Sequence, residues 1–143
     1  MTDLSQFTDL EIFAGTLLGE SESLGERGME GTALTIINRA ALDLHWMGGN
    51  TVRGVCLQKG QYDVWDGGAD TNRVSQIMTQ NVLYGPYVEA MQIADDGLAG
   101  RLQDWTNGAV SYVDPPAVAI THPGAEPCLV DGERKYYDLK AVA

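Results

Sequence analysis

Apolar residues recur at the three- and four-residue spacing of an amphipathic helix in four stretches of the chain. The pattern Thr8-x-x-Glu11 is a capping box that begins the first helix, and Gly19 is expected to end it. The second helix is expected to begin near Gly28, and Pro86 suits the first turn of the fourth. The four apolar stripes are Leu10, Phe13, Ala14, Leu17 and Leu18; Met29, Ala33, Ile36, Ile37 and Ala40; Val74, Ile77 and Met78; and Tyr87, Ala90, Met91, Ala94 and Leu98.

Short β-branched or aromatic runs alternate with turn-forming residues in the remainder. Residues 51–57, 109–113 and 135–139 are typical of strands, and the prolines at 115, 116 and 123 restrict the chain between the last two to loops or edges. The pattern therefore predicts an α+β fold, mainly α, with a small β-sheet. At 143 residues we expect one domain, residues 1–143.

The connector between the first two predicted helices, residues 19–26, concentrates acidic side chains. Glu20 follows the last apolar position of the first helix, where the helix dipole disfavours an anion, and Glu22 and Glu26 add like charge. Both effects raise the pKa of Glu20, and burial against an apolar neighbour would raise it further. A carboxylic acid that keeps its proton near neutral pH suits general acid catalysis of glycosidic cleavage. The alternative is a solvated acidic loop.

A second candidate region combines an amide, a phenol, a carboxylate and an indole within residues 61–65. Tyr62 and Trp65 offer faces that stack on the C–H groups of a sugar, while Gln61 and Asp63 can bond its hydroxyls. The alternative is that the two aromatic side chains hold a loop against the core.

Asn38 and Arg39 stand in the last turn predicted for the second helix. A cation there is favoured by the helix dipole, so Arg39 can serve as an ordinary C-terminal charge. Alternatively, its side chain reaches back and orients an acidic side chain of the connector.

Metal and cofactor chemistry find little support in the residue pattern. Cys56 and Cys128 belong to no zinc-binding spacing and are expected to be small buried residues, with a disulfide between them left open. The oxygen-rich stretch 66–72 lacks EF-hand spacing and is expected to be a turn before the third helix. His122, beside Pro123, is expected on the surface. We expect no metal and no cofactor.

Charge and hydropathy argue against further classes of protein, namely nucleic-acid-binding, membrane-spanning and secreted proteins. Twenty Asp and Glu residues against nine Lys and Arg residues give a formal net charge of -11, which repels nucleic-acid phosphates, so nucleic acid is not an expected partner. No apolar run reaches the roughly 18 residues that span a bilayer, and the N-terminus lacks the features of a secretory signal. We therefore expect no membrane insertion and synthesis in the cytoplasm without a signal peptide.

Taken in order, these landmarks resemble the SleB-type family of spore-cortex-lytic cell-wall hydrolases, which includes phage lysins. No single piece is diagnostic, but their order and spacing extend over most of the chain. The matching pieces are Gly19-Glu20, Gly25-Glu26, Glu30-Gly31, Asn38-Arg39, Thr51-Val52, Gly54-Val55, Gly60-Gln61-Tyr62, Trp65, Asp104, Thr106 to Ala109, Tyr112, Gly132 and Tyr137.

The resemblance implies a lysozyme-like helical domain that cleaves the bond between N-acetylmuramic acid and N-acetylglucosamine, with the family's catalytic glutamate on Glu20. Some members of the family are lytic transglycosylases, which need one glutamate, whereas hydrolysis needs a second carboxylate, for which Glu26 and Asp63 are the candidates. We expect the substrate-binding residues to be Glu26, Gln61, Tyr62, Asp63, Trp65 and Tyr112.

The sequence also departs from the family pattern. The connector before Glu26 is longer than usual, Asp63 stands where a serine is common, and histidines often found near Tyr112 and in the terminal motif are absent. We expect a monomer that binds peptidoglycan glycan strands and reaches the bacterial wall through holin-type release or as a virion component. The alternative, from a different class, is a non-catalytic glycan-binding or structural virion protein that keeps the fold.

Overall fold

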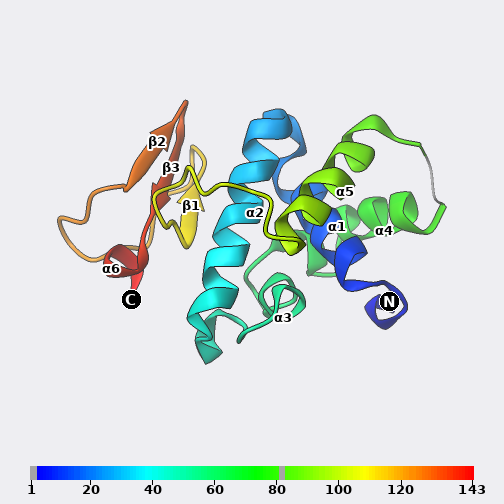
Figure 1. Cartoon of the computed structure of the whole chain (residues 1–143), viewed down its shortest axis with the longest axis horizontal. Coiled ribbons are helices and arrows are strands. Elements are labelled where there is room, and N and C mark those ends of the chain that lie inside the picture. The colour runs from blue at the N-terminus through cyan, green and yellow to red at the C-terminus, as the bar shows by residue number, and fades with distance from the viewer. Residues whose placement is uncertain (1–2, 81–82) are drawn as a thin grey trace.

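The computed structural model describes residues 3–80 and 83–143. Helices occupy the N-terminal two thirds and a small sheet follows near the C-terminus, so the predicted mainly α, α+β class is confirmed (Figure 1). The likeness to lysozyme and the single domain stay predictions. The α-helices are α1 (Asp9–Ser21), α2 (Gly25–Leu42), α3 (Val52–Cys56), α4 (Ala69–Gln80), α5 (Gly85–Leu98) and α6 (Leu139–Val142), with short 3-10 turns η1 (Leu4–Gln6), η2 (Glu22–Leu24), η3 (His45–Met47) and η4 (Asp63–Trp65).

Helix α1 begins as the sequence predicts and ends later. The side chain of Thr8 accepts from the Glu11 N–H at 3.1 Å while Glu11 accepts from the Thr8 N–H at 2.9 Å, which confirms the capping box. The helix continues through Gly19 to Ser21, and α2 begins at Gly25 rather than near Gly28. Glu20 is therefore a residue of α1 itself and does not lie in an open connector.

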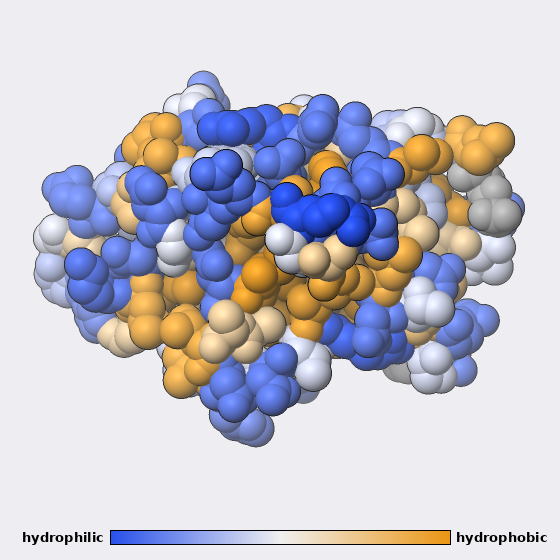
Figure 2. Space-filling view, viewed as in Figure 1, coloured by the Kyte–Doolittle hydropathy of each residue, from blue (hydrophilic) through white to orange (hydrophobic). Residues whose placement is uncertain are grey.

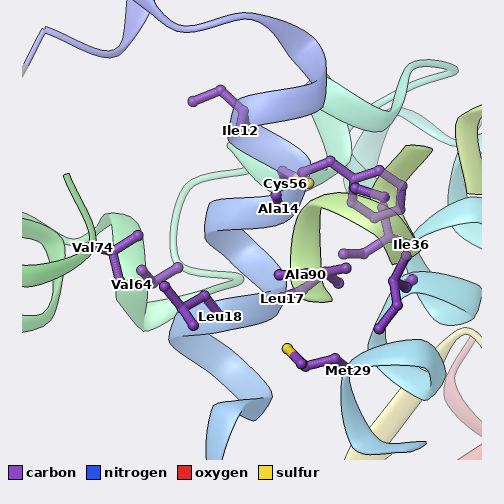
Figure 3. Close-up of a cluster of buried hydrophobic side chains, with 14 of the residues drawn as sticks. Ile12, Ala14, Leu17, Leu18, Met29, Ile36, Cys56, Val64, Val74 and Ala90 are labelled. Carbon is purple, nitrogen blue, oxygen red and sulfur yellow. The ribbon is translucent and has the colours of Figure 1, made fainter. Parts of the chain in front are cut away.

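The hydrophobic core surrounds α1. Leu17 and Leu18 of α1 are fully buried, and Figure 3 shows Leu18 pointing toward Val64 and Val74 while Leu17 lies near Ala90. The helices α2, α3, α4 and α5 all contribute side chains to the same cluster. The core thus fixes the orientation of α1, and with it the position of Glu20 at its C-terminal end.

Residues 51–57 were expected to be a strand, and this prediction is wrong. They contain α3, whose first turn is capped by Thr51, the side chain of which accepts from the Gly54 N–H at 2.9 Å. The side chains of Val55 and Cys56 point into the helical core. A capping threonine and burial on one side therefore outweigh the β-propensity of this run. The next helix, α4, also begins earlier than predicted, at Ala69 within the oxygen-rich stretch.

The sheet has three antiparallel strands in the order β1 (Ser111–Val113), β3 (Arg134–Tyr137) and β2 (Leu129–Asp131). Tyr112 pairs with Tyr136, and Val130 pairs with Lys135. The strands predicted at 109–113 and 135–139 are confirmed as β1 and β3, whereas β2 was missed. In Figure 1 the sheet lies beside α2, on the side away from α1 and α5.

The structure also describes the cysteines, His122 and the surface. Cys56 and Cys128 are both free thiols, Cys56 buried and Cys128 half-buried. His122 is exposed. Within residues 3–80 and 83–143, no helix is both long and apolar enough to cross a membrane, and no group of three acidic, histidine or cysteine side chains could hold a metal ion. On the face in Figure 2, hydrophobic residues gather over α2 and its neighbours, with hydrophilic residues around the margins.

Candidate functional site

Glu20 lies where three cavities meet. Its half-buried side chain lines a cavity of about 530 Å³ beside the sheet, a smaller one of about 110 Å³, and one of about 440 Å³ toward α4 and α5. The largest is lined by Glu20, Ser23, Leu24, Arg27, Gly28, Asp114, Pro115, Asp131, Gly132, Glu133, Arg134 and Tyr136. An acidic side chain thus borders three cavities and does not stand on an open surface.

The environment raises the pKa of Glu20 to about 7. Burial is the largest cause, followed by the negative charge of Asp63, while the Val64 N–H and the Tyr112 hydroxyl act in the opposite direction. The predicted direction is therefore confirmed, and burial, which the sequence analysis named as an additional cause, is the largest one. Glu22, which was expected to add repulsion, pairs with Arg73 at 2.5 Å.

A close approach of η4 to α1 brings Asp63 and Val64 beside Glu20. A β-carbon built on Gly19 would lie 2.3 Å from Cγ2 of Val64 and 2.6 Å from its Cβ, so only glycine fits between the two segments. The glycine that the sequence indicated as a helix breaker therefore serves a packing role. The absence of a side chain at Gly19 allows η4 to approach α1, so that the Asp63 carboxylate and the Val64 N–H lie near Glu20.

On the other side, the sheet supplies Tyr112. Its hydroxyl donates to Oε1 of Glu20 at 3.4 Å, and burial followed by the charge of Glu20 raises the pKa of Tyr112, so the phenol remains a donor. The guanidinium of Arg134 lies 3.9 Å from the centre of the Tyr112 ring. Cation–π contact with a buried arginine restricts the ring and hence the hydroxyl that reaches Glu20.

Arg134 itself holds the sheet against the helices. It is buried, forms an ion pair with Asp114 at 2.8 Å, and donates to the Gly28 carbonyl, to Thr32 and to Ser21, each at 3.0 Å. The sequence analysis missed this residue. Its signal was the two-residue alternation of β3, which puts Arg134 and Tyr136 on the same, buried face of the strand.

The small cavity brings together several of the residues that the sequence singled out. Gln61, Tyr62 and Tyr112 line it with Glu20, and so does Arg39 from the last turn of α2. The Nε–H of Arg39 donates to the Val110 carbonyl, so the residue joins α2 to the segment before β1. No hydrogen bond or ion pair joins Arg39 to a carboxylate within residues 19–26. Asp63 is exposed and acts on Glu20 through its charge.

Two further candidates lie apart from these cavities. The indole N–H of Trp65 donates to Thr16 Oγ1 at 2.9 Å, and the ring packs close to Gly15, which agrees with the loop-anchoring alternative for this side chain. Glu26 is exposed in the first turn of α2 and lines none of the three cavities that contain Glu20. Substrate contact by Trp65 and Glu26 stays a prediction.

Comparison with known families agrees with an enzyme of the cell wall. The family model described as Cell Wall Hydrolase matches residues 23–126, most of the chain, so this protein belongs to the cell wall hydrolase family. Membership supports a role in peptidoglycan degradation. The matched segment begins just after Glu20 and includes the other lining residues of the small cavity. No curated protein and no solved structure matches the chain.

Proposed function

We propose that this protein cleaves the glycosidic bond between N-acetylmuramic acid and N-acetylglucosamine in peptidoglycan, with Glu20 as the general acid and base. The observation that carries the proposal is the half-buried Glu20 with a pKa of about 7 at the junction of three cavities. A group with such a pKa is populated in both protonation states at neutral pH, as a residue that first donates and then accepts a proton requires. The family supports the substrate class.

The lytic transglycosylase route needs this one carboxyl group. Protonated Glu20 donates to the oxygen that leaves C1 of N-acetylmuramic acid. The resulting carboxylate then takes the proton of the C6 hydroxyl of the same sugar as that oxygen attacks C1, which gives a 1,6-anhydro product. The hydroxyl of Tyr112, 3.4 Å from Oε1, stabilises Glu20 in its charged form between the two steps.

Hydrolysis is the alternative route at the same site. It would use Asp63, the carboxylate whose charge acts most strongly on Glu20, either as nucleophile or as the base that activates water. Both routes share the acid and the bond cleaved, and they differ in the end group of the product.

The test is digestion of isolated sacculi followed by mass analysis of the released muropeptides. Anhydro ends indicate a transglycosylase and reducing ends indicate a hydrolase. Glu20→Gln should lower release by roughly 1,000-fold or more, because the amide cannot donate the proton. Glu126→Gln, at an exposed loop position, removes one negative charge elsewhere and should retain activity.

Three results would contradict the proposal. Activity in a folded Glu20→Gln variant would move the acid to another residue, first of all Glu26. Binding to sacculi with no release of muropeptides by the unmodified protein would favour the non-catalytic, glycan-binding alternative. Release of peptides with intact glycan strands would place the cleavage outside the sugar chain.

A further inference from the structure

The outer face of the sheet carries a cation between apolar side chains. Lys135 is exposed in β3, and its cross-strand neighbours are Val113 of β1 and Val130 of β2. Cross-strand neighbours point to the same face of a sheet, which here is the face opposite to Arg134 and Tyr136. None of the six ion pairs formed by the described residues includes Lys135. Its ammonium group is therefore available to a partner from outside the chain.

A loop adds an apolar wall to this face of the sheet. Residues 115–121 follow β1 and contain no charged side chain. Most of them border, together with Val113 and Lys135, a cavity of about 380 Å³, which we call the outer cavity. Val118 in its wall is 87% exposed. Lys135 is the one cation in the lining of the outer cavity, so this cavity suits a ligand that has methyl groups and a carboxylate.

The outer cavity adjoins the large cavity that contains Glu20. Pro115 and Glu133 line both cavities, and they stand at one end of the sheet, shortly after β1 and directly before β3. Glu133 is exposed and, like Lys135, takes part in none of the six ion pairs of the described residues. A ligand that extends from the large cavity into the outer one would therefore pass Glu133 and then reach Lys135.

We infer that the outer cavity binds the stem peptide of peptidoglycan, with Glu133 facing the side-chain amine of its third residue and Lys135 facing its terminal carboxylate. This rests on the proposed function for the identity of the polymer. The stem peptide is amide-bonded to the lactyl group of N-acetylmuramic acid, so it extends away from a sugar that lies beside Glu20 in the large cavity. It ends in D-alanine, whose methyl group suits the apolar loop.

The order of charges along the stem peptide matches their order along this part of the chain. In a stem that is not cross-linked, the free amine comes before the terminal carboxylate. Glu133 likewise precedes Lys135 by two residues, about 6.5 Å of extended chain. Cross-linking converts the amine or the carboxylate to an amide and removes its charge. The outer cavity should therefore favour stems that are not cross-linked.

The experiment measures the binding of three stem peptides, without sugar, to the full chain. They are L-Ala-γ-D-Glu-L-Lys-D-Ala-D-Ala, the same peptide acetylated on the lysine amine, and the same peptide with a C-terminal amide. Each is titrated at pH 7 and followed by ¹H–¹⁵N NMR at Val113, Ala119 and Lys135. We expect the unmodified peptide to bind roughly 2- to 5-fold more tightly than either modified one, as for exposed ion pairs.

Two variants separate the two contacts. Lys135→Gln should abolish the preference for the free carboxylate and keep the preference for the free amine, and Glu133→Gln should do the reverse. Both positions are exposed, so both variants should fold. Lys59→Gln is the matched control, because Lys59 is exposed and lines neither the large nor the outer cavity. The control should keep both preferences.

Equal affinity for the three peptides, or both preferences unchanged in Lys135→Gln and Glu133→Gln, would overturn the inference. Shifts of the same amide signals with protein concentration, in the absence of peptide, would assign this face to a second copy of the chain and would also overturn it.

The assay contains no glycan, so its result is separate from that of the sacculus digestion. Glycan cleavage without the peptide preferences removes the stem-peptide site alone. Peptide preferences without glycan cleavage support the stem-peptide site and remove the proposed activity.

Discussion

In the helical region, one cluster of buried hydrophobic side chains joins α1 to α5, whereas none of the described sheet residues belongs to that cluster. Several polar contacts attach the sheet to α2. Arg134 bonds Gly28, Thr32 and Ser21, and Arg39 and Asn38 bond the segment before β1. Gly31 of α2 permits the approach, because a β-carbon there would lie 1.9 Å from the hydroxyl of Tyr136.

The difference matters because the site lies between the two regions. Glu20 belongs to the helical region and its partner Tyr112 to the sheet, and the large cavity has walls from both. Hydrophobic contacts depend little on orientation, whereas hydrogen bonds and ion pairs fix distances and angles. The helical region thus supplies stability, and the polar junction supplies the geometry around the acid.

The largest expected effect comes from the helical core. Leu17→Ala removes a fully buried side chain and should lower the free energy of unfolding by about 2–5 kcal/mol. The measurement is urea denaturation followed by circular dichroism. Activity per folded molecule at low temperature should change little, since Leu17 does not line the cavities around Glu20. A cost below about 1 kcal/mol would mean that the core is less tightly packed than the structure indicates.

Arg134→Met tests the polar junction. Loss of the guanidinium leaves Asp114 and several acceptors without their partner and should cost about 2–4 kcal/mol. Hydrogen exchange should become faster at β1 and β3 while α1 and α5 remain protected. The rate of glycan cleavage should fall more than substrate affinity does, because Tyr112 loses its support. Uniform loss of protection in both regions would show that they do not separate in this way.

Glu20→Gln should stabilise the protein, by an amount that depends on pH. The pKa of Glu20 rises from its ordinary value of 4.5 to about 7 on folding, so between these values the folded state binds more protons and stability falls as pH increases. Glutamine avoids this cost. The variant should be more stable than the unmodified protein by about 1–3 kcal/mol at pH 8, with little difference at pH 4. Denaturation at the two pH values, with Glu126→Gln as control, measures this; an equal difference at both would contradict it.

Tyr112→Phe should have the smallest effect. The hydroxyl lowers the pKa of Glu20, so its removal raises that pKa further. The fall in activity on the alkaline side should therefore move to higher pH, with the maximal rate reduced by less than about 10-fold. The pH profile of sacculus digestion is the measurement. A shift to lower pH would show that the tyrosine does not act on Glu20 as a hydrogen-bond donor.

Apart from α3, which was predicted as a strand, the helices from α1 to α5 were predicted from the sequence to within a few residues, because local signals agree there. The capping box at Thr8, the stripe through Leu17 and Leu18 and the proline at the start of α5 all depend on residues a few positions apart. The direction of the pKa shift at Glu20 was also accessible. That burial is the largest cause, and that Asp63 adds to it, could not be predicted, because both depend on a packing contact across more than forty residues.

In the sheet region, β2 and the role of Arg134 could not be predicted from local sequence signals. The strand β2 is three residues long and gives no clear alternation, and Arg134 gains its role only when β3 packs against α2. Similarly, nothing in the local sequence around Arg39 shows that its side chain donates to the Val110 carbonyl. Contacts between segments distant in the chain decide these features, and a single sequence does not display them.

Each region also contains one cysteine, and the two differ in exposure. Burial raises the pKa of the Cys56 thiol to about 12, so in the folded protein it stays protonated and shielded from alkylating reagents. Cys128 is half-buried just before β2. A reagent such as iodoacetamide would therefore label the two sulfur atoms at different rates. The rate at Cys56 would report how often the helical core opens, and the rate at Cys128 would report the same for the sheet, both in one unmodified molecule.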